Sequence, residues 1–148
     1  MQEHIQNELA SFIANCDWEK IAPHFKEDAA YRVLDWIGCA VAGEHYPQVE
    51  IAQKYFIENG DQGNSTVIGH QTKCSPRTAA FLNGIAGHVC ELDDGHRTAI
   101  GHPGSIAVPT ALALGEHLNA SGADVLKAVI LGYEVFSRLG RTVNPSHY

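Results

Sequence analysis

Reactive side chains are concentrated between residues 91 and 104, in the segment Glu-Leu-Asp-Asp-Gly-His-Arg-Thr-Ala-Ile-Gly-His-Pro-Gly. Three carboxylates, two imidazoles and one guanidinium stand within these fourteen residues, and apolar, alanine-rich stretches flank them. Carboxylates and imidazoles can accept and donate protons, and a guanidinium binds carboxylates. The glycines and the proline predict a loop. We expect this acid/histidine loop to bring proton acceptors, proton donors and an anion-binding group into one pocket.

Individual residues of the acid/histidine loop suit different steps. Asp93 and Asp94 are adjacent, so their side chains should diverge, one facing the pocket and the other binding backbone. The imidazoles of His96 and His102 suit general acid–base catalysis, and Arg97 offers a planar fork for a carboxylate. His-Pro-Gly precedes a helix whose first N–H groups favour an anion. The set is typical of proton abstraction next to a carboxylate, as in dehydration, decarboxylation or racemisation of a polycarboxylic acid.

Structural roles compete at every one of these positions. Asp-Asp-Gly is a common turn and His-Pro-Gly a common way to begin a helix, so each residue alone favours a structural role, and the set as a whole favours function. A metal site from Asp93, Asp94, His96 and His102 lacks regular ligand spacing, so we predict neither a metal nor a cofactor. His88 lies one helical turn before Leu92, close to the loop; core packing is its expected role, and lining the same pocket is the alternative.

Composition indicates one ordinary globular domain of 148 residues. The net charge of −7 and the lack of a basic stripe argue against nucleic acid as a partner. Four cysteines occur without zinc-finger or C-x-x-C spacing, so we expect reduced thiols. The N-terminus has early acids and no basic region, and the longest apolar run, residues 106–114, is too short for a membrane span. We expect a soluble, cytoplasmic protein that does not bind membranes.

Apolar periodicity and capping residues predict an almost entirely helical, all-α fold. The fourth helix is rich in small residues and should be central, and several helices are apolar around most of their circumference. That pattern indicates packing against something else. We expect an apolar stripe on the second helix at Ala30, Val33, Leu34, Ile37, Ala40 and Val41. The predicted helices cover about residues 2–15, 27–43, 47–60, 75–90, 104–118 and 121–145.

Six segments stand in a recognisable order and spacing: Asp35–Gly43, Asn83–His88, Leu92–Asp94, Gly101–Gly104, Pro109–Leu114 and Ile130–Val135. Through them, residues 27–148 resemble the amino-terminal part of the MmgE/PrpD family. The Asp-Asp pair followed by His-Pro-Gly is the most specific feature.

The resemblance implies a mostly helical domain, a second α+β lid domain and usually a homodimer. It also implies a cofactor-independent lyase or isomerase that acts on small di- or tricarboxylates, since the family includes 2-methylcitrate dehydratase, cis-aconitate decarboxylase and an iminodisuccinate epimerase. It further implies His102, Asp93 and Asp94 as catalytic residues, with substrate contacts from Glu91, His96, Arg97 and Gly104.

Two departures refine this expectation. The loop after the acidic pair lacks the tryptophan of 2-methylcitrate dehydratases, so the chain resembles the epimerase and unassigned branches more. Family members are also several-fold longer, so we expect a partial helical domain without the lid, inactive alone and completed by missing C-terminal segments. The alternatives are a non-catalytic carboxylate-binding or assembly module completed by another chain, or a non-functional remnant.

Overall fold

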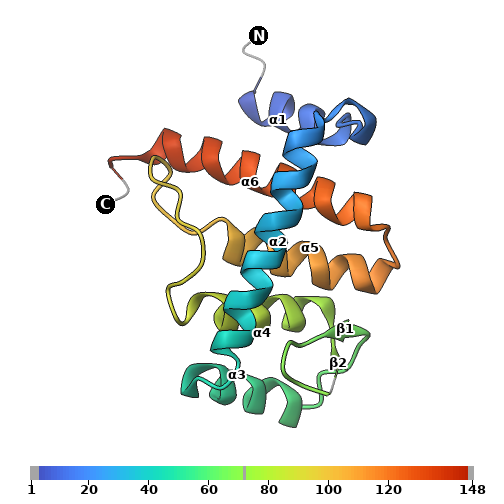
Figure 1. Cartoon of the computed structure of the whole chain (residues 1–148), viewed down its shortest axis with the longest axis vertical. Helices are drawn as coiled ribbons and strands as arrows, with labels where there is room; N and C mark the ends of the chain where they lie inside the picture. Colours follow the sequence, from blue (N-terminus) through green and yellow to red (C-terminus); the bar gives the residue numbers. More distant parts are fainter. Residues whose placement is uncertain (1–3, 72, 147–148) are drawn as a thin grey trace.

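The computed structural model describes residues 4–71 and 73–146, and this part of the chain is mainly helical, as the sequence predicts (Figure 1). Its elements are α1 (Ile5–Ala14), a 3-10 turn η1 (Trp18–Lys20), α2 (Pro23–Gly43), α3 (Pro47–Glu58), β1 (Ser65–Thr66), β2 (Lys73–Cys74), α4 (Pro76–His88), α5 (Gly104–Leu118) and α6 (Gly122–Val143).

The predicted starts of α4 and α6 are confirmed by their caps, whereas α2 begins at Pro23, four residues before the predicted start. Ser75 accepts a hydrogen bond from the N–H of Thr78, and Pro76 opens α4. Ser121 accepts from the N–H of Asp124 at the start of α6, and its hydroxyl donates to the Asp124 carboxylate. These side chains satisfy backbone donors that a helix end leaves without partners, which is why α4 and α6 begin where the sequence predicts.

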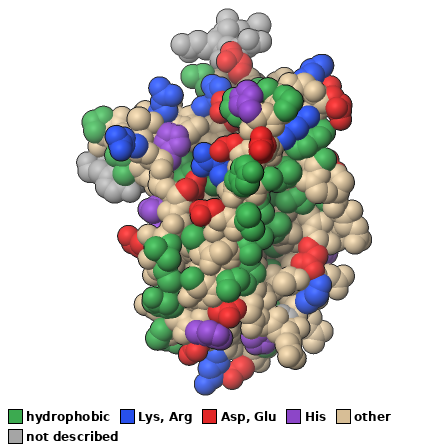
Figure 2. All heavy atoms as spheres, in the orientation of Figure 1, with side chains coloured by type: hydrophobic (Ala, Val, Ile, Leu, Met, Phe, Trp, Pro, Cys, Tyr) green, Lys and Arg blue, Asp and Glu red, His purple; other side chains and the backbone are tan. Residues whose placement is uncertain are grey.

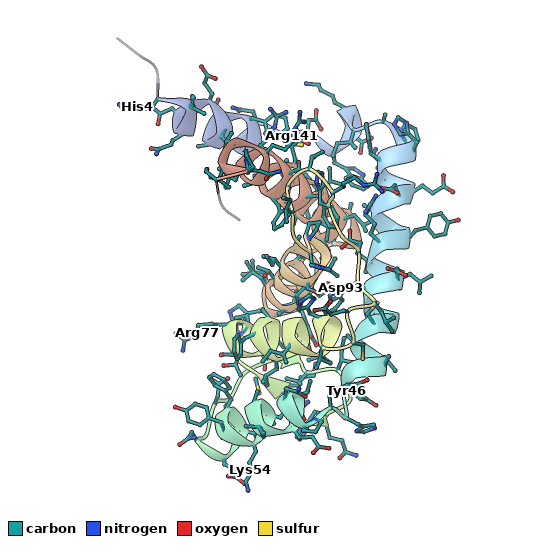
Figure 3. The ribbon with its side chains drawn as sticks, turned by 90° about the vertical axis from the view of Figure 1, so that its left-hand side faces the viewer. His4, Tyr46, Lys54, Arg77, Asp93 and Arg141 are labelled. Atoms are coloured by element: carbon teal, nitrogen blue, oxygen red, sulfur yellow. The ribbon has the colours of Figure 1, made fainter. Side chains whose placement is uncertain are left out.

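Helices α3, α4, α5 and α6 are stacked one upon the next, and α2 crosses the stack along one side (Figures 1 and 3). As predicted, α4 is central, because it packs on α2, α3 and α5. The main core gathers side chains from every layer except α1: Trp36, Ala40, Val49, Ala86, Val108, Ala111 and Val129. The acid/histidine loop joins α4 to α5 and therefore leaves the middle of the stack next to α2.

The buried face of α2 differs from the predicted stripe. Leu34 and Val41 are exposed, at 64% and 52%, whereas Trp36 and Gly43 are buried. The small residues of α4 decide this, because a Cβ at Gly87 would collide with the Trp36 indole and one at Gly43 with the carbonyl of Ala86. The close approach of α2 and α4 thus selects the face with tryptophan and glycine over the more hydrophobic one.

Large hydrophobic side chains remain on the surface. Figure 2 shows them along the face that α2 crosses, and they include Tyr31, Leu34, Ile37 and Val41. No residue of α1 is buried, and Ile5 at its start is 81% exposed. Apolar patches of this kind mark surfaces that bind another protein segment. Among the described residues, no helix is both long and apolar enough to cross a bilayer.

A short antiparallel pairing of β1 with β2 is attached to α5 by the Ser65 hydroxyl, which donates to the carbonyl of Ala113 at 2.7 Å, and by the Glu116 side chain. The Glu116 carboxylate accepts hydrogen bonds from the N–H and the hydroxyl of Thr66 at 2.6 and 2.8 Å, and from Lys73 at 2.5 Å. Burial opposes ionisation of Glu116, but the Lys73 ammonium and the Thr66 donors outweigh it and lower the pKa of this carboxyl group.

The contact between α2 and α4 predicts opposite effects for two glycine substitutions. Gly87→Ala should destabilise the protein by about 1–3 kcal/mol, because the added methyl group collides with Trp36. Gly38→Ala should stabilise it by about 0.5–1 kcal/mol, since nothing lies within 4 Å and alanine favours a helix. Urea denaturation of both variants measures these changes. Equal effects of the two substitutions would contradict the proposed close approach.

The contacts of Glu116 with Thr66 and Lys73 predict that the attachment of the two strands to α5 weakens in acid. Because folding lowers the pKa of Glu116, its contribution is fully present above the ordinary value of 4.5 and is lost as the pH falls through the lower folded value. The melting temperature of Glu116→Gln should therefore lie below that of the wild type at neutral pH, and the difference should shrink below pH 4.5. Glu50→Gln, on an exposed position of α3, serves as the control. A constant difference across this range would refute the assignment.

Candidate active site

A buried carboxylate lies between two imidazoles at the start of the acid/histidine loop. The side chain of Asp93 is 1% exposed, and its Oδ1 lies 3.0 Å from Nδ1 of His88. Nδ1 of His102 lies 3.3 Å from Oδ2 of the same carboxylate. The two imidazole centroids are 4.6 Å apart, with the rings tilted by 60°. Three residues distant in sequence by up to fourteen positions thus form one compact group, which we call the His–Asp–His cluster.

A chain of hydrogen bonds from α2 fixes the Asp93 carboxylate. The Ser105 hydroxyl donates to Oδ2 of Asp93 at 2.6 Å, and the Trp36 indole N–H donates to the same hydroxyl oxygen at 3.3 Å. Trp36 is itself buried in the main core. The orientation of Asp93, which lies beside α5 in Figure 3, is therefore set by core packing and not by solvent.

Both imidazoles open onto a groove of about 630 Å³ between α4 and α5, which we call the histidine groove. Their side chains are 44% and 36% exposed for His88 and His102 respectively. The remaining lining is largely apolar and includes Gln48, Phe81, Ile85, Ile106, Pro109 and Thr110. A largely apolar groove with a few polar groups, here two imidazoles, is typical of a small-molecule site.

Asp94 has a different role, as the sequence predicts for one member of the pair. Its Oδ1 accepts from the N–H of Gly104 at 3.0 Å, and its Oδ2 accepts from Arg32 at 3.0 Å. The Arg32 guanidinium also lies over the Tyr133 ring. Burial and the neighbouring Asp94 charge raise the pKa of the Tyr133 hydroxyl, which therefore stays protonated. Asp94 joins the loop to α2, α5 and α6.

The remaining candidates lie away from the His–Asp–His cluster. Nδ1 of His96 accepts from the N–H of Ala99 at 3.0 Å and shapes the loop. His96 and Arg97 line a second cavity of about 1010 Å³ that also includes Arg32 and Asp94. Glu91 is exposed, with a left-handed backbone at φ 49°. Gly104 is buried, and its N–H is already bound by Asp94.

The expectation of one pocket is therefore wrong in its geometry. Asp93 contacts the two imidazoles of the histidine groove, whereas Asp94 binds Arg32 and lines the larger cavity, so the two adjacent carboxylates have different partners. The loop thus separates the imidazoles of His88 and His102 from the guanidinium of Arg97. Arg97 and the two imidazoles thus line different cavities.

The N-terminal domain model of the MmgE/PrpD family matches residues 7–148. This chain belongs to the MmgE/PrpD family. The match extends the predicted resemblance, which began at residue 27, to nearly the whole chain. The family's segments in this sequence converge on the site, since Trp36, His88, Asp93, His102 and Tyr133 all come from them.

Curated MmgE/PrpD relatives carry the name of one activity. The chain is 31% identical over 144 residues to a cis-aconitate decarboxylase-like protein of Aspergillus oryzae, covering 93% of this chain and 30% of that protein. It is 32% identical over 144 residues to a cis-aconitate decarboxylase of Aspergillus terreus, covering 94% and 29%. The human cis-aconitate decarboxylase is 35% identical over 112 residues, covering 72% and 23%. The chain thus spans less than a third of the length of these relatives.

Sequence reasoning assigned His88 to the core and did not select Trp36, Ser105 or Arg32. His88 is partly exposed and contacts Asp93 because α4 ends there, immediately before the loop. A histidine at the last turn of a helix that leads into an acidic loop is a signal that could have identified it. Trp36 and Arg32 lie about sixty positions away on α2, so no local pattern indicates them. Glu134 and Arg138, four residues apart on α6, form an ion pair with Nε to Oε1 at 2.7 Å, as expected for such a spacing on a helix.

The Asp94 contacts predict a structural role that a neutral side chain cannot replace. Asp94→Asn should lower the free energy of unfolding by about 1–3 kcal/mol, because charged hydrogen bonds to Arg32 are lost in a partly buried position. Asp35→Asn, at an exposed position on α2, should change it by less than about 0.5 kcal/mol. Chemical denaturation monitored by circular dichroism compares the two. An Asp94 variant as stable as the wild type would rule out this role.

Proposed function

We propose that this chain carries the acid–base centre of a lyase or isomerase that acts on small di- or tricarboxylates, with His102 as the proton-transfer residue. The observation that carries the proposal is the buried Asp93 carboxylate against Nδ1 of His102, at the N-terminus of α5 in an MmgE/PrpD domain. Membership of the family supports a lyase-type activity. The geometry around Asp93 supports His102 as the proton-transfer residue.

Asp93 favours the tautomer of His102 that a base requires. Oδ2 of Asp93 lies 3.3 Å from Nδ1 of His102 without a well-directed hydrogen bond, and its negative charge favours the ring proton on that nearer nitrogen, which leaves Nε2 as the acceptor. Because Nδ1 of His102 is buried while the side chain is 36% exposed, the accessible part of the ring is the side that carries Nε2. His88 shares the same carboxylate and supplies a second imidazole for the complementary proton transfer. Asp93 is thus a positioning residue for both imidazoles.

The histidine groove suits a small anionic substrate. The N-terminus of α5 carries the positive end of a helix dipole beside His102, which favours a carboxylate. No acidic side chain is among the described residues that line the groove, and the Asp93 carboxylate lies behind the two imidazoles with only 1% of its side chain exposed. The volume of about 630 Å³ lies within the usual range for small-molecule sites.

These groups support two related reactions. In a dehydration, the imidazole removes a proton from the carbon next to a carboxylate, and the departing hydroxyl group takes up a proton and leaves as water. In a decarboxylation, carbon dioxide leaves and a protonated imidazole donates its proton to the carbon that retains the electron pair. The names of the relatives favour cis-aconitate as the first acid to test. The activity of the longer relatives is carried to this chain only as part of this proposal.

A second candidate function is an assembly module that binds another polypeptide. The exposed apolar side chains of α1 and α2 favour it, because such faces gain free energy when covered. A second copy of the chain, or a chain that supplies the remaining segments of the family, would cover them. This candidate keeps the His–Asp–His cluster and does not require the chain to be active alone.

The proposed function predicts stabilisation by its substrate class. Thermal melts of the 148-residue chain with cis-aconitate, citrate and a monocarboxylate control should show a rise only for the di- or tricarboxylates. Ligand at one hundred times its dissociation constant stabilises a protein by about 2.7 kcal/mol, which amounts to several degrees. The rise should disappear in His102→Asn and persist in His117→Asn, an exposed histidine in the last turn of α5. A rise that survives in His102→Asn would overturn the assignment of the residue.

Sedimentation velocity separates the second candidate from the first. Self-association that Leu34→Lys and Val41→Lys abolish, with no response to any acid, would favour the assembly module. A monomer that responds to the acids would favour the acid–base centre.

A further inference from the structure

We propose that His88, Asp93 and His102 bind a divalent transition-metal ion of the zinc class, and that this ion switches off the imidazole base. Each residue offers one ligand atom, and all three atoms lie within 4.8 Å of one another. Two imidazole nitrogens and a carboxylate oxygen are a donor set that zinc accepts, whereas magnesium and calcium prefer oxygen ligands alone. Sequence spacing does not indicate this set, because α4, the loop and the start of α5 each supply one member.

The separations between the donor atoms approach those of a metal centre. Zinc binds nitrogen and oxygen at about 2.0–2.2 Å, so tetrahedral ligands are about 3.3 Å from one another. Asp93 lies 3.0 Å from Nδ1 of His88 and 3.3 Å from Nδ1 of His102. The two imidazole nitrogens need to approach each other by at most roughly 1.5 Å. Both side chains are partly exposed on the groove, so small rotations can supply that movement.

Two further observations point to a ligand at this place. Nδ1 of His102 is buried and makes no hydrogen bond with any residue that the structure describes, although Asp93 is close, because the direction of the contact is unsuitable. The carboxylate is also oriented from behind by Ser105, and Ser105 in turn by Trp36. Metal-binding carboxylates are commonly held in this way by outer hydrogen bonds.

An ion bound here would compete with proton transfer, a consequence that rests on the proposed function. A neutral imidazole carries one N–H, so metal at Nδ1 of His102 moves the ring proton to Nε2 and removes the acceptor. Three protein ligands also leave one position of a tetrahedral ion open. Binding of the ion itself depends only on the His–Asp–His cluster.

Isothermal titration of the 148-residue chain with zinc chloride tests the site directly, in a buffer that does not chelate metals. We expect one ion per chain, and a cobalt(II) spectrum of nitrogen and oxygen ligation. His88→Asn, Asp93→Asn and His102→Asn should each weaken binding at least tenfold, and Ser105→Ala should weaken it 10–100-fold. His45→Asn and His117→Asn, both exposed, should bind like the wild type. Circular dichroism confirms that each variant is folded.

Three results would overturn this inference: no binding at a ratio of one, unchanged affinity in His88→Asn and His102→Asn, or a thiolate-to-cobalt absorption band that assigns the ion to cysteine. Melts with acid, with and without zinc, separate this inference from the proposed function. Zinc binding without any response to acids would sustain the metal site and refute the proposed function. A response to acids without zinc binding would do the reverse.

Discussion

The carboxylate of Asp93 is almost sealed from solvent, and a buried charge is unfavourable unless other groups compensate it. Here the compensation comes from His88 on α4, His102 before α5 and Ser105 in the first turn of α5. These partners can meet only if α4 and α5 pack side by side with the loop folded back between them. The requirement to satisfy one carboxylate therefore couples the helix packing to the chemistry of the site.

Helix α2 completes this arrangement from a distance in sequence. Trp36 fills the space above Gly87 and directs its N–H to Ser105, while Arg32 binds Asp94 on the opposite side of the loop. The two adjacent aspartates are thus held by two residues one helical turn apart on α2. The core holds Asp93 against the two imidazoles through Trp36 and Ser105, and the oppositely directed Asp94 anchors the loop to α2.

The surface and the site impose different demands on the same chain. Burial of Trp36 and Gly43 against α4 serves the site, and as a result the more hydrophobic face of α2 stays exposed. A chain that spans less than a third of its relatives can hold the His–Asp–His cluster in place and still present apolar faces that favour association. The proposed acid–base chemistry and the proposed assembly are therefore compatible with one another.

The sequence by itself determined the helical fold, the caps of α4 and α6, the family, and the loop with His102, because periodicity, capping and motif spacing are local properties. Only the tertiary structure decided which face of α2 is buried, that His88 joins Asp93, and that Asp93 and Asp94 face different cavities. Those outcomes depend on contacts between residues up to about seventy positions apart. Steric fit between α2 and α4 sets them, and no local pattern encodes that fit.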